Sequence, residues 1–161
     1  MPAPKRAKNT GQESPMCKKM DIDAVQKGFN TGIICAQQVL NHFSERFGLS
    51  EKDALLVAAC FGSGMGQAST CGCVTGALMA MGLAHGVAGP CSLEQKQSLN
   101  ARRDAFMAAF AAANGSIECR GVLGHDLTDP QQLAVIKEKK LFTTVCVPLI
   151  CDTCTLLEEY L

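Results

Sequence analysis

The sequence predicts an all-α protein, a compact bundle of helices around a buried central helix rich in glycine and alanine. Three observations support this fold class. Apolar residues recur at spacings of three and four along most of the chain, which is the period of an amphipathic helix. No stretch longer than four residues alternates in the manner of a strand. The segment 54–93 contains no Lys, Arg, Asp or Glu, as expected of the protein interior.

Residues 1–20 are expected to form a disordered basic tail, and residues 21–161 a single helical, Cys-rich redox domain. The tail carries five Lys or Arg residues against one Glu, and few apolar residues. It has no apolar stretch after its basic residues, so it does not resemble a secretory signal. We therefore expect a cytoplasmic protein whose thiols stay reduced.

The first helix is predicted to begin at Asp21 and to end near Gly28. The next helix carries one apolar stripe and ends at Gly48, where a glycine commonly closes a helix in the left-handed conformation. Ser50 has the side chain and the position to cap the helix that follows.

Residues 62–70 contain three glycines and no charge, which indicates a loop or a very tight turn. Thr70 is the predicted cap of the central helix, which runs from Cys71 to about Ala84. This helix is apolar on every side, so it is expected to be buried. Two pairs of glycines spaced four apart are expected to let another backbone approach closely: Gly72 with Gly76, and Gly82 with Gly86.

The longest amphipathic helix is predicted to start after Ser92, because Ser92 and Gln95 have the spacing of a capping box. Ser116 is the predicted cap of a short segment, and Pro130 occupies the favoured first position of the next helix. Pro148 is expected to kink or interrupt a last helical stretch that carries three cysteines: Cys146, Cys151 and Cys154.

The ten cysteines bear most directly on function. In a reducing compartment, this many thiols in one domain indicate metal binding, an iron–sulfur cluster or thiol redox chemistry. The formal charge is zero, and there are seven Phe, one Tyr and no Trp, which argues against nucleic acid as a partner. The glycine-rich loop splits the uncharged segment into pieces too short for a membrane span. Haem attachment is not expected, since Thr155 rather than His follows the last cysteine pair.

Two local groups of cysteines are candidates for metal binding or thiol redox chemistry. Cys71-Gly-Cys73 opens a helix, where free N–H groups and the helix dipole lower the pKa of a thiol. Cys146, Cys151 and Cys154 have the C-x4-C-x2-C spacing that also occurs in plant-type ferredoxins. The last two share a helix face, and such a pair binds metal or forms a redox disulfide.

Several runs together resemble one family. They are F-x-x-G-x-x-C-A-Q at 29–37, FGSGMG at 61–66, CGCVTGALM at 71–79, CRGVLGHDLTDP at 119–130 and the segment 140–146 that ends in Cys. Over about residues 24–160 the chain resembles the redox-active proteins named for the motif C_GCAxxG_C_C. Related domains occur in split-Soret cytochromes, whose haem motif is absent here. The resemblance implies that the four family cysteines are Cys35, Cys71, Cys119 and Cys146.

This chain departs from the family pattern at four cysteines. Cys73 stands where the family usually has Ala, and Cys60, Cys151 and Cys154 are additions. Either a larger or second cluster or simply tolerated extra thiols would account for them. We treat Cys73, Cys151 and Cys154 as secondary candidates for metal binding.

Three functions stay open from the sequence. The leading hypothesis is a protein for electron transfer or redox sensing, with an iron–sulfur cluster on the thiolates of the four family cysteines and a partner redox protein. The second is a cofactor-free thiol–disulfide oxidoreductase, in which Cys71 attacks and Cys73 or Cys119 resolves. The third is a zinc site of four cysteines that staples an interaction module. Whether the protein is an enzyme stays open, and the sequence also allows a homodimer.

Overall fold

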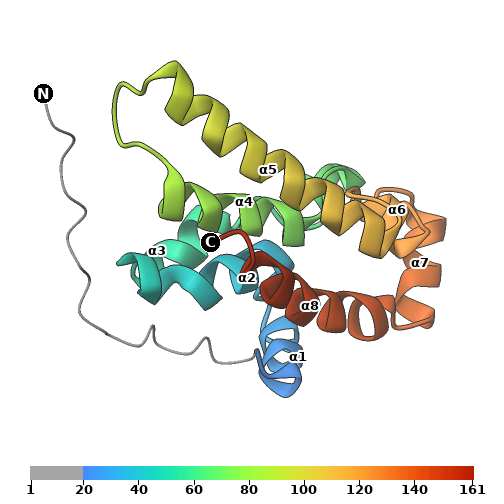
Figure 1. Ribbon diagram of the computed structural model, residues 1–161. Coiled ribbons are helices and arrows are strands. Elements are labelled where there is room, and N and C mark those ends of the chain that lie inside the picture. The colour runs from blue at the N-terminus through green and yellow to red at the C-terminus, as the bar shows by residue number, and fades with distance from the viewer. Residues whose placement is uncertain (1–19) are drawn as a thin grey trace, which may run out of the picture.

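The computed structural model describes residues 20–161, and eight α-helices make up most of this part of the chain (Figure 1). The predicted tail thus lies almost wholly outside the described residues. Within residues 20–161 there is no strand, and an isolated bridge pairs Thr70 with Glu118. The all-α prediction is confirmed. The helices are α1 (Ile22–Asn30), α2 (Cys35–Ser44), α3 (Glu51–Ala58), α4 (Gly72–His85), α5 (Leu93–Asn114), α6 (Cys119–Leu123), α7 (Pro130–Glu138) and α8 (Val147–Leu157).

Most predicted helix starts carry the predicted caps. Asp21 accepts from the N–H of Asp23 at 3.2 Å, and Ser50 caps α3. Ser92 and Gln95 form the reciprocal capping box of α5, with hydrogen bonds of 3.2 Å and 2.8 Å. Pro130 is the first residue of α7. These contacts join residues at most three apart, which is why the sequence alone predicts them.

Three predicted boundaries were wrong by one or two residues. The N-cap of α4 is Cys71 and not Thr70, whose backbone instead pairs with Glu118. The N-cap of α6 is Glu118 and not Ser116, whose hydroxyl accepts a hydrogen bond from the N–H of Glu118 at 3.0 Å. The helix α1 continues to Asn30, past Gly28. At the first two positions a contact between distant segments decided the boundary.

The helix α4 lies at the centre of the fold, with α2 against one side and α5 running along another (Figure 1). A Cβ atom placed on Gly76 would lie 2.7 Å from the carbonyl oxygen of Ala36, so glycine is required where α2 crosses α4. The predicted close approach at the second glycine pair was wrong. Nothing lies within 4 Å of a Cβ on Gly82, and a Cβ on Gly86 would meet only the backbone of Gly82 itself.

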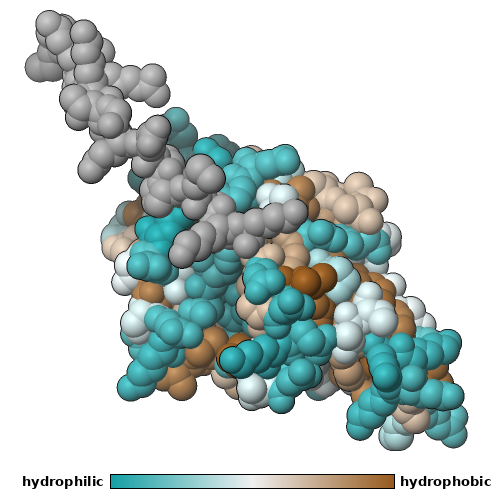
Figure 2. Space-filling view, turned by 90° about the horizontal axis from the view of Figure 1, so that it is seen from below, coloured by the Kyte–Doolittle hydropathy of each residue, from teal (hydrophilic) through white to brown (hydrophobic). Residues whose placement is uncertain are grey.

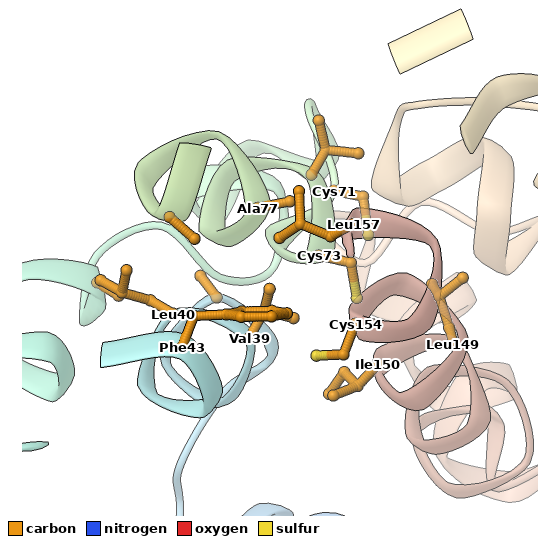
Figure 3. Packing of buried hydrophobic residues seen from close by; sticks show 14 of the residues in the cluster. Val39, Leu40, Phe43, Cys71, Cys73, Ala77, Leu149, Ile150, Cys154 and Leu157 are labelled. Atoms are coloured by element: carbon orange, nitrogen blue, oxygen red, sulfur yellow. The ribbon is translucent and has the colours of Figure 1, made fainter. Parts of the chain in front are cut away.

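The core forms where α2, α4 and α8 meet (Figure 3). Phe43 of α2, Ala77 of α4 and Leu157 of α8 are each at most 1% exposed. Cys73 and Cys154 lie in the same layer, between α4 and α8. Thiols therefore form part of the core packing as well as of any site.

Hydrophilic and hydrophobic residues are interspersed on the face seen in Figure 2. No single helix among residues 20–161 is both long and apolar enough to cross a membrane. Within the described part of the chain, one pair of helical segments is long and apolar enough when taken together, α7 with the stretch 142–157, but the pair is bent by 68°. The large hydrophobic side chains that are exposed come from several elements: Ile22, Leu56, Val57, Met65, Leu83, Val87 and Leu93.

Candidate functional site

The four cysteines that the resemblance implies stand at or next to the starts of four helices. Cys35 and Cys119 are the first residues of α2 and α6, Cys71 is the N-cap of α4, and Cys146 directly precedes α8. The first N–H groups of a helix lack intrahelical partners and favour a negative charge. Cys146 differs, because the residues Phe142–Cys146 before α8 already form a π-helical turn. Three of the four cysteines therefore stand at helix starts, where any stabilisation of a thiolate has to compete with burial.

All four of these cysteines, together with Cys73, line one small pocket of about 40 Å³. Such a volume exceeds what one water molecule needs. Among the described residues, no Lys, Arg, His, Asp or Glu lines the pocket. The segments that contribute the thiols are far apart in sequence, so only the fold brings them together. The other lining residues are one serine and six apolar residues: Ser63, Phe29, Ile34, Leu123, Leu127, Phe142 and Leu149.

Gly72 sets how closely the thiol of Cys35 approaches α4. A Cβ on residue 72 would collide with Sγ of Cys35 and would lie 3.1 Å from both the Ala36 nitrogen and the Gly62 Cα. Cys35 Sγ therefore lies against the backbone between Cys71 and Cys73. A side chain of any size at position 72 would separate these thiols.

Cys71 is the thiol best prepared to ionise. The Cys73 thiol donates a hydrogen bond to it, and the backbone N–H groups of Cys73 and Val74 donate further ones. These hydrogen bonds lower the pKa of Cys71, although burial opposes them. The same hydrogen bond to Cys71 raises the pKa of Cys73, since it favours the protonated thiol of Cys73. Complete burial of the Cys73 side chain raises this pKa further. Cys73 is thus placed to donate a hydrogen bond to the Cys71 sulfur when Cys71 loses its proton.

Burial keeps the other three pocket thiols protonated in the metal-free protein. Burial first, and then the negative charge of Cys71, raise the pKa of Cys35 to about 11 and that of Cys119 to about 12. Burial and the charges of Cys35 and Cys71 raise the pKa of Cys146 as well. Each of these thiols thus lies within electrostatic reach of Cys71.

Alkaline pH is expected to destabilise the reduced, metal-free protein. The pKa of Cys35 is about 11 when folded, against 9.0 as its ordinary value, so the unfolded chain loses this proton first. The contribution of Cys35 to stability is therefore fully present below about pH 9 and is lost as the pH rises through its folded pKa. Between those limits Cys35 alone lowers the free energy of unfolding by about 1.4 kcal/mol per pH unit. Urea unfolding from pH 8 to 11, with a chelator and a reductant present, measures this. A Cys35→Ser variant should show a shallower dependence, and an equal slope in both proteins would contradict the assignment.

Cys151 and Cys154 do not line the pocket, so the C-x4-C-x2-C run does not act as one set of ligands there. Cys154 is 2% exposed, and its Sγ lies 3.4 Å from Sδ of Met20. Cys60 and Cys91 are exposed at the surface. No disulfide joins any of the nine described cysteines.

The loop before α4 contains a left-handed turn at residues 63–66. All four residues have a positive φ, including Ser63 at 56° and Met65 at 56°. Residues other than glycine are disfavoured in this conformation. The backbone N–H of Ser63 donates to Cys35, which opposes the effect of burial on that thiol's pKa. The turn therefore brings a hydrogen-bond donor to the pocket.

The donor set of the pocket suits soft metals. Apart from Ser63, the polar side chains that line it are five thiols, and thiolates are the ligands of iron–sulfur clusters and of structural Zn²⁺. A single tetrahedral Zn²⁺ holds each sulfur at about 2.3 Å, so the four sulfurs crowd within about 4 Å of one another. Among residues 20–161, no group of three or more His, Cys, Asp or Glu side chains is placed to hold a metal ion.

Sequence reasoning ranked Cys73 below the four family cysteines, and it gave no role to Ser63. The C-x-C spacing was the available signal for Cys73, since it follows the helix cap Cys71 by two residues. Ser63 could not have been found, because its contribution is a backbone N–H in an unusual conformation.

A family model described as "Putative redox-active protein (C_GCAxxG_C_C)" matches residues 33–160. This match includes all five pocket cysteines and most of the chain. Searches among curated proteins and among solved structures found no match.

Proposed function

Because this chain belongs to the C_GCAxxG_C_C family of redox-active proteins, we propose that the cysteine pocket is its redox centre and holds an iron–sulfur cluster. The observation that carries the proposal is the arrangement of Cys35, Cys71, Cys119 and Cys146 around one pocket. Four thiolates are the usual ligand set of such clusters. Electron transfer or redox sensing is the corresponding activity, with a redox protein as partner.

A cluster and a single Zn²⁺ ion can both be held by four thiolates, but they require different spacings of the sulfurs. A cluster of several irons lies between its ligands and separates them further than one Zn²⁺ does. Among the described residues no group of three or more His, Cys, Asp or Glu side chains is placed to hold a metal ion, and measured metal content decides between a cluster and a zinc staple. When bound, the cluster would take up and release one electron at a time.

The surroundings of the pocket would tune such a centre. Three helix starts and the Ser63 N–H direct positive partial charge towards the thiolates, while apolar side chains such as Phe29 and Phe142 limit the access of water. Hydrogen bonds to sulfur and limited solvent exposure are among the factors that set the potential of a cluster. With no charged side chain among the described residues of the pocket wall, backbone dipoles are the main compensation for the thiolate charge.

Metal analysis of protein purified without oxygen and without an affinity metal tests this proposal. We expect iron and acid-labile sulfide in similar amounts, with a broad absorption band near about 400 nm. A Cys60→Ser variant should retain both, because Cys60 is exposed and not part of the pocket. Zinc alone would instead support the interaction module, and protein with neither metal would overturn the cluster.

The hydrogen bond between Cys71 and Cys73 favours a second candidate, a cofactor-free dithiol. On oxidation the two sulfurs would form one bond, and two protons and two electrons would pass to the disulfide of a partner, which becomes two thiols. Counting thiols before and after mild oxidation of the metal-free protein tests this. A loss of two thiols, mapped to Cys71 and Cys73, supports the dithiol, and an unchanged count rejects it.

A further inference from the structure

Arg120 connects α6, which begins at the pocket residue Cys119, to the end of the loop before α4. Its Nε donates to the carbonyl oxygen of Ala68 at 3.2 Å, and its Nη2 donates to the carbonyl oxygen of Gln67 at 3.2 Å. Two carboxylates lie against the same guanidinium, Asp126 at 3.4 Å and Glu118 at 3.5 Å. One planar side chain thus joins α6 to the end of the loop, and its fork geometry is specific to arginine.

The segment that Arg120 holds includes strained residues. Ala68 has a φ of 52°, and Ser63 and Met65 have a φ of 56° in the left-handed turn at residues 63–66. L-residues avoid this region, so such a conformation persists only where surrounding contacts impose it. Without an external tie, the segment would open more often than its neighbours.

The strained turn acts directly on one pocket thiol. Ser63 lines the pocket, and its backbone N–H donates to Cys35. If the turn relaxed, this donor would leave and the pocket wall beside Cys35 would open. The loop end is also joined to α6 by a backbone bond of 2.6 Å from the Cys119 N–H to the Ser69 carbonyl. Removing the Arg120 side chain leaves that bond in place.

We propose that Arg120 is a positioning residue, which holds the end of the loop and with it the left-handed turn whose Ser63 lines the pocket, and thereby limits access to Cys35. The inference deepens the proposed function, since it concerns the protection of the same redox centre. Arg120 itself does not line the pocket, so it acts through the loop.

Alkylation of the reduced, metal-free protein tests the proposal, with each cysteine followed by mass spectrometry. In Arg120→Gln we expect Cys35 to react about tenfold faster, because Cys35 is only partly accessible and opening of the turn would expose it further. The rate at Cys154, buried elsewhere in the core, should stay within about twofold of wild type. Arg103→Gln is the matched control, since Arg103 pairs with Asp104 on α5 and should leave both rates unchanged. A Cys35 rate equal to wild type, or a parallel rise at Cys154, would overturn the proposal.

Relief of strain at Met65 distinguishes positioning from a merely structural role of Arg120. Met65 is 42% exposed and does not line the pocket. In an Arg120→Gln background, Met65→Gly should return the Cys35 rate to near wild type, because glycine accepts a positive φ. Met65→Ala keeps the strain and should not rescue. If the two substitutions behave alike, Arg120 does not act through the turn.

These measurements are independent of the cluster. If wild-type protein binds no iron, the proposed function fails while the alkylation result still decides the role of Arg120. If iron is bound and Arg120→Gln leaves the alkylation rates unchanged, only the positioning proposal fails.

Discussion

The Cys71→Ser variant is expected to lose most of its bound iron and the associated absorption band. Cys71 is the pocket thiol whose pKa is lowered, and its charge acts on Cys35, Cys73, Cys119 and Cys146. Loss of a residue that merely orients a ligand typically lowers metal affinity about 10- to 100-fold. Loss of this ligand should therefore cost at least about 100-fold. Iron and sulfide per chain, measured beside the Cys60→Ser control, give the result.

The same variant provides a readout that needs no metal. The negative charge of Cys71 contributes to the raised pKa values of Cys35 and Cys119. Removing that charge should lower the pKa of both thiols, so their alkylation should begin at a lower pH in Cys71→Ser. Normal iron content together with unchanged alkylation profiles would show that the pocket is not the centre. A normal circular dichroism spectrum establishes that the variant folds.

The Gly72→Ala variant is expected to have the largest effect on stability. The added Cβ would collide with Cys35 Sγ, and backbone atoms of Ala36 and Gly62 at 3.1 Å leave it little room to move. Overpacking of this kind costs about 2 kcal/mol, which corresponds to a fall of about 5 °C in Tm for a chain of this size. Because Cys35 must move, bound iron should fall as well. Thermal unfolding and metal analysis measure the two effects.

Gly82→Ala is the matched control on the same helix. Nothing lies within 4 Å of a Cβ at that position, so the substitution removes only the helix-breaking tendency of glycine. We expect Gly82→Ala to be more stable than wild type by roughly 0.5 to 1 kcal/mol. Equal effects of the two substitutions would mean that helix propensity, and not the approach of α2, decides the stability of α4.

Local signals explain the parts of the fold that the sequence predicts well. The capping box of Ser92 and Gln95 and the first-turn Pro130 depend on residues within one turn of each other. Gly48 and Gly115 end their helical segments with a positive φ, as isolated glycines after apolar stripes commonly do. Such features need no information about distant parts of the chain.

The glycines of α4 show where local signals stop. Gly72 with Gly76 and Gly82 with Gly86 have the same spacing, yet only the first pair lies where α2 crosses the helix. Sequence spacing predicts which residues share a helix face, but it does not predict which face packs against another helix. The predicted Thr70 cap failed similarly, because Glu118 from a distant segment pairs with that residue.

For the site, the sequence by itself determined the kind of side chain available: a helical domain rich in thiols, with Cys71 and Cys73 at a helix start and a match to the C_GCAxxG_C_C family over residues 33–160. Only the tertiary structure decided which thiols share the pocket, bringing in Cys73 and leaving out Cys151 and Cys154. It also decided that Ser63 adopts a positive φ and directs its N–H at Cys35. The physical reason is that thiol type and helix capping are properties of neighbouring residues, whereas burial and strain depend on contacts between distant segments.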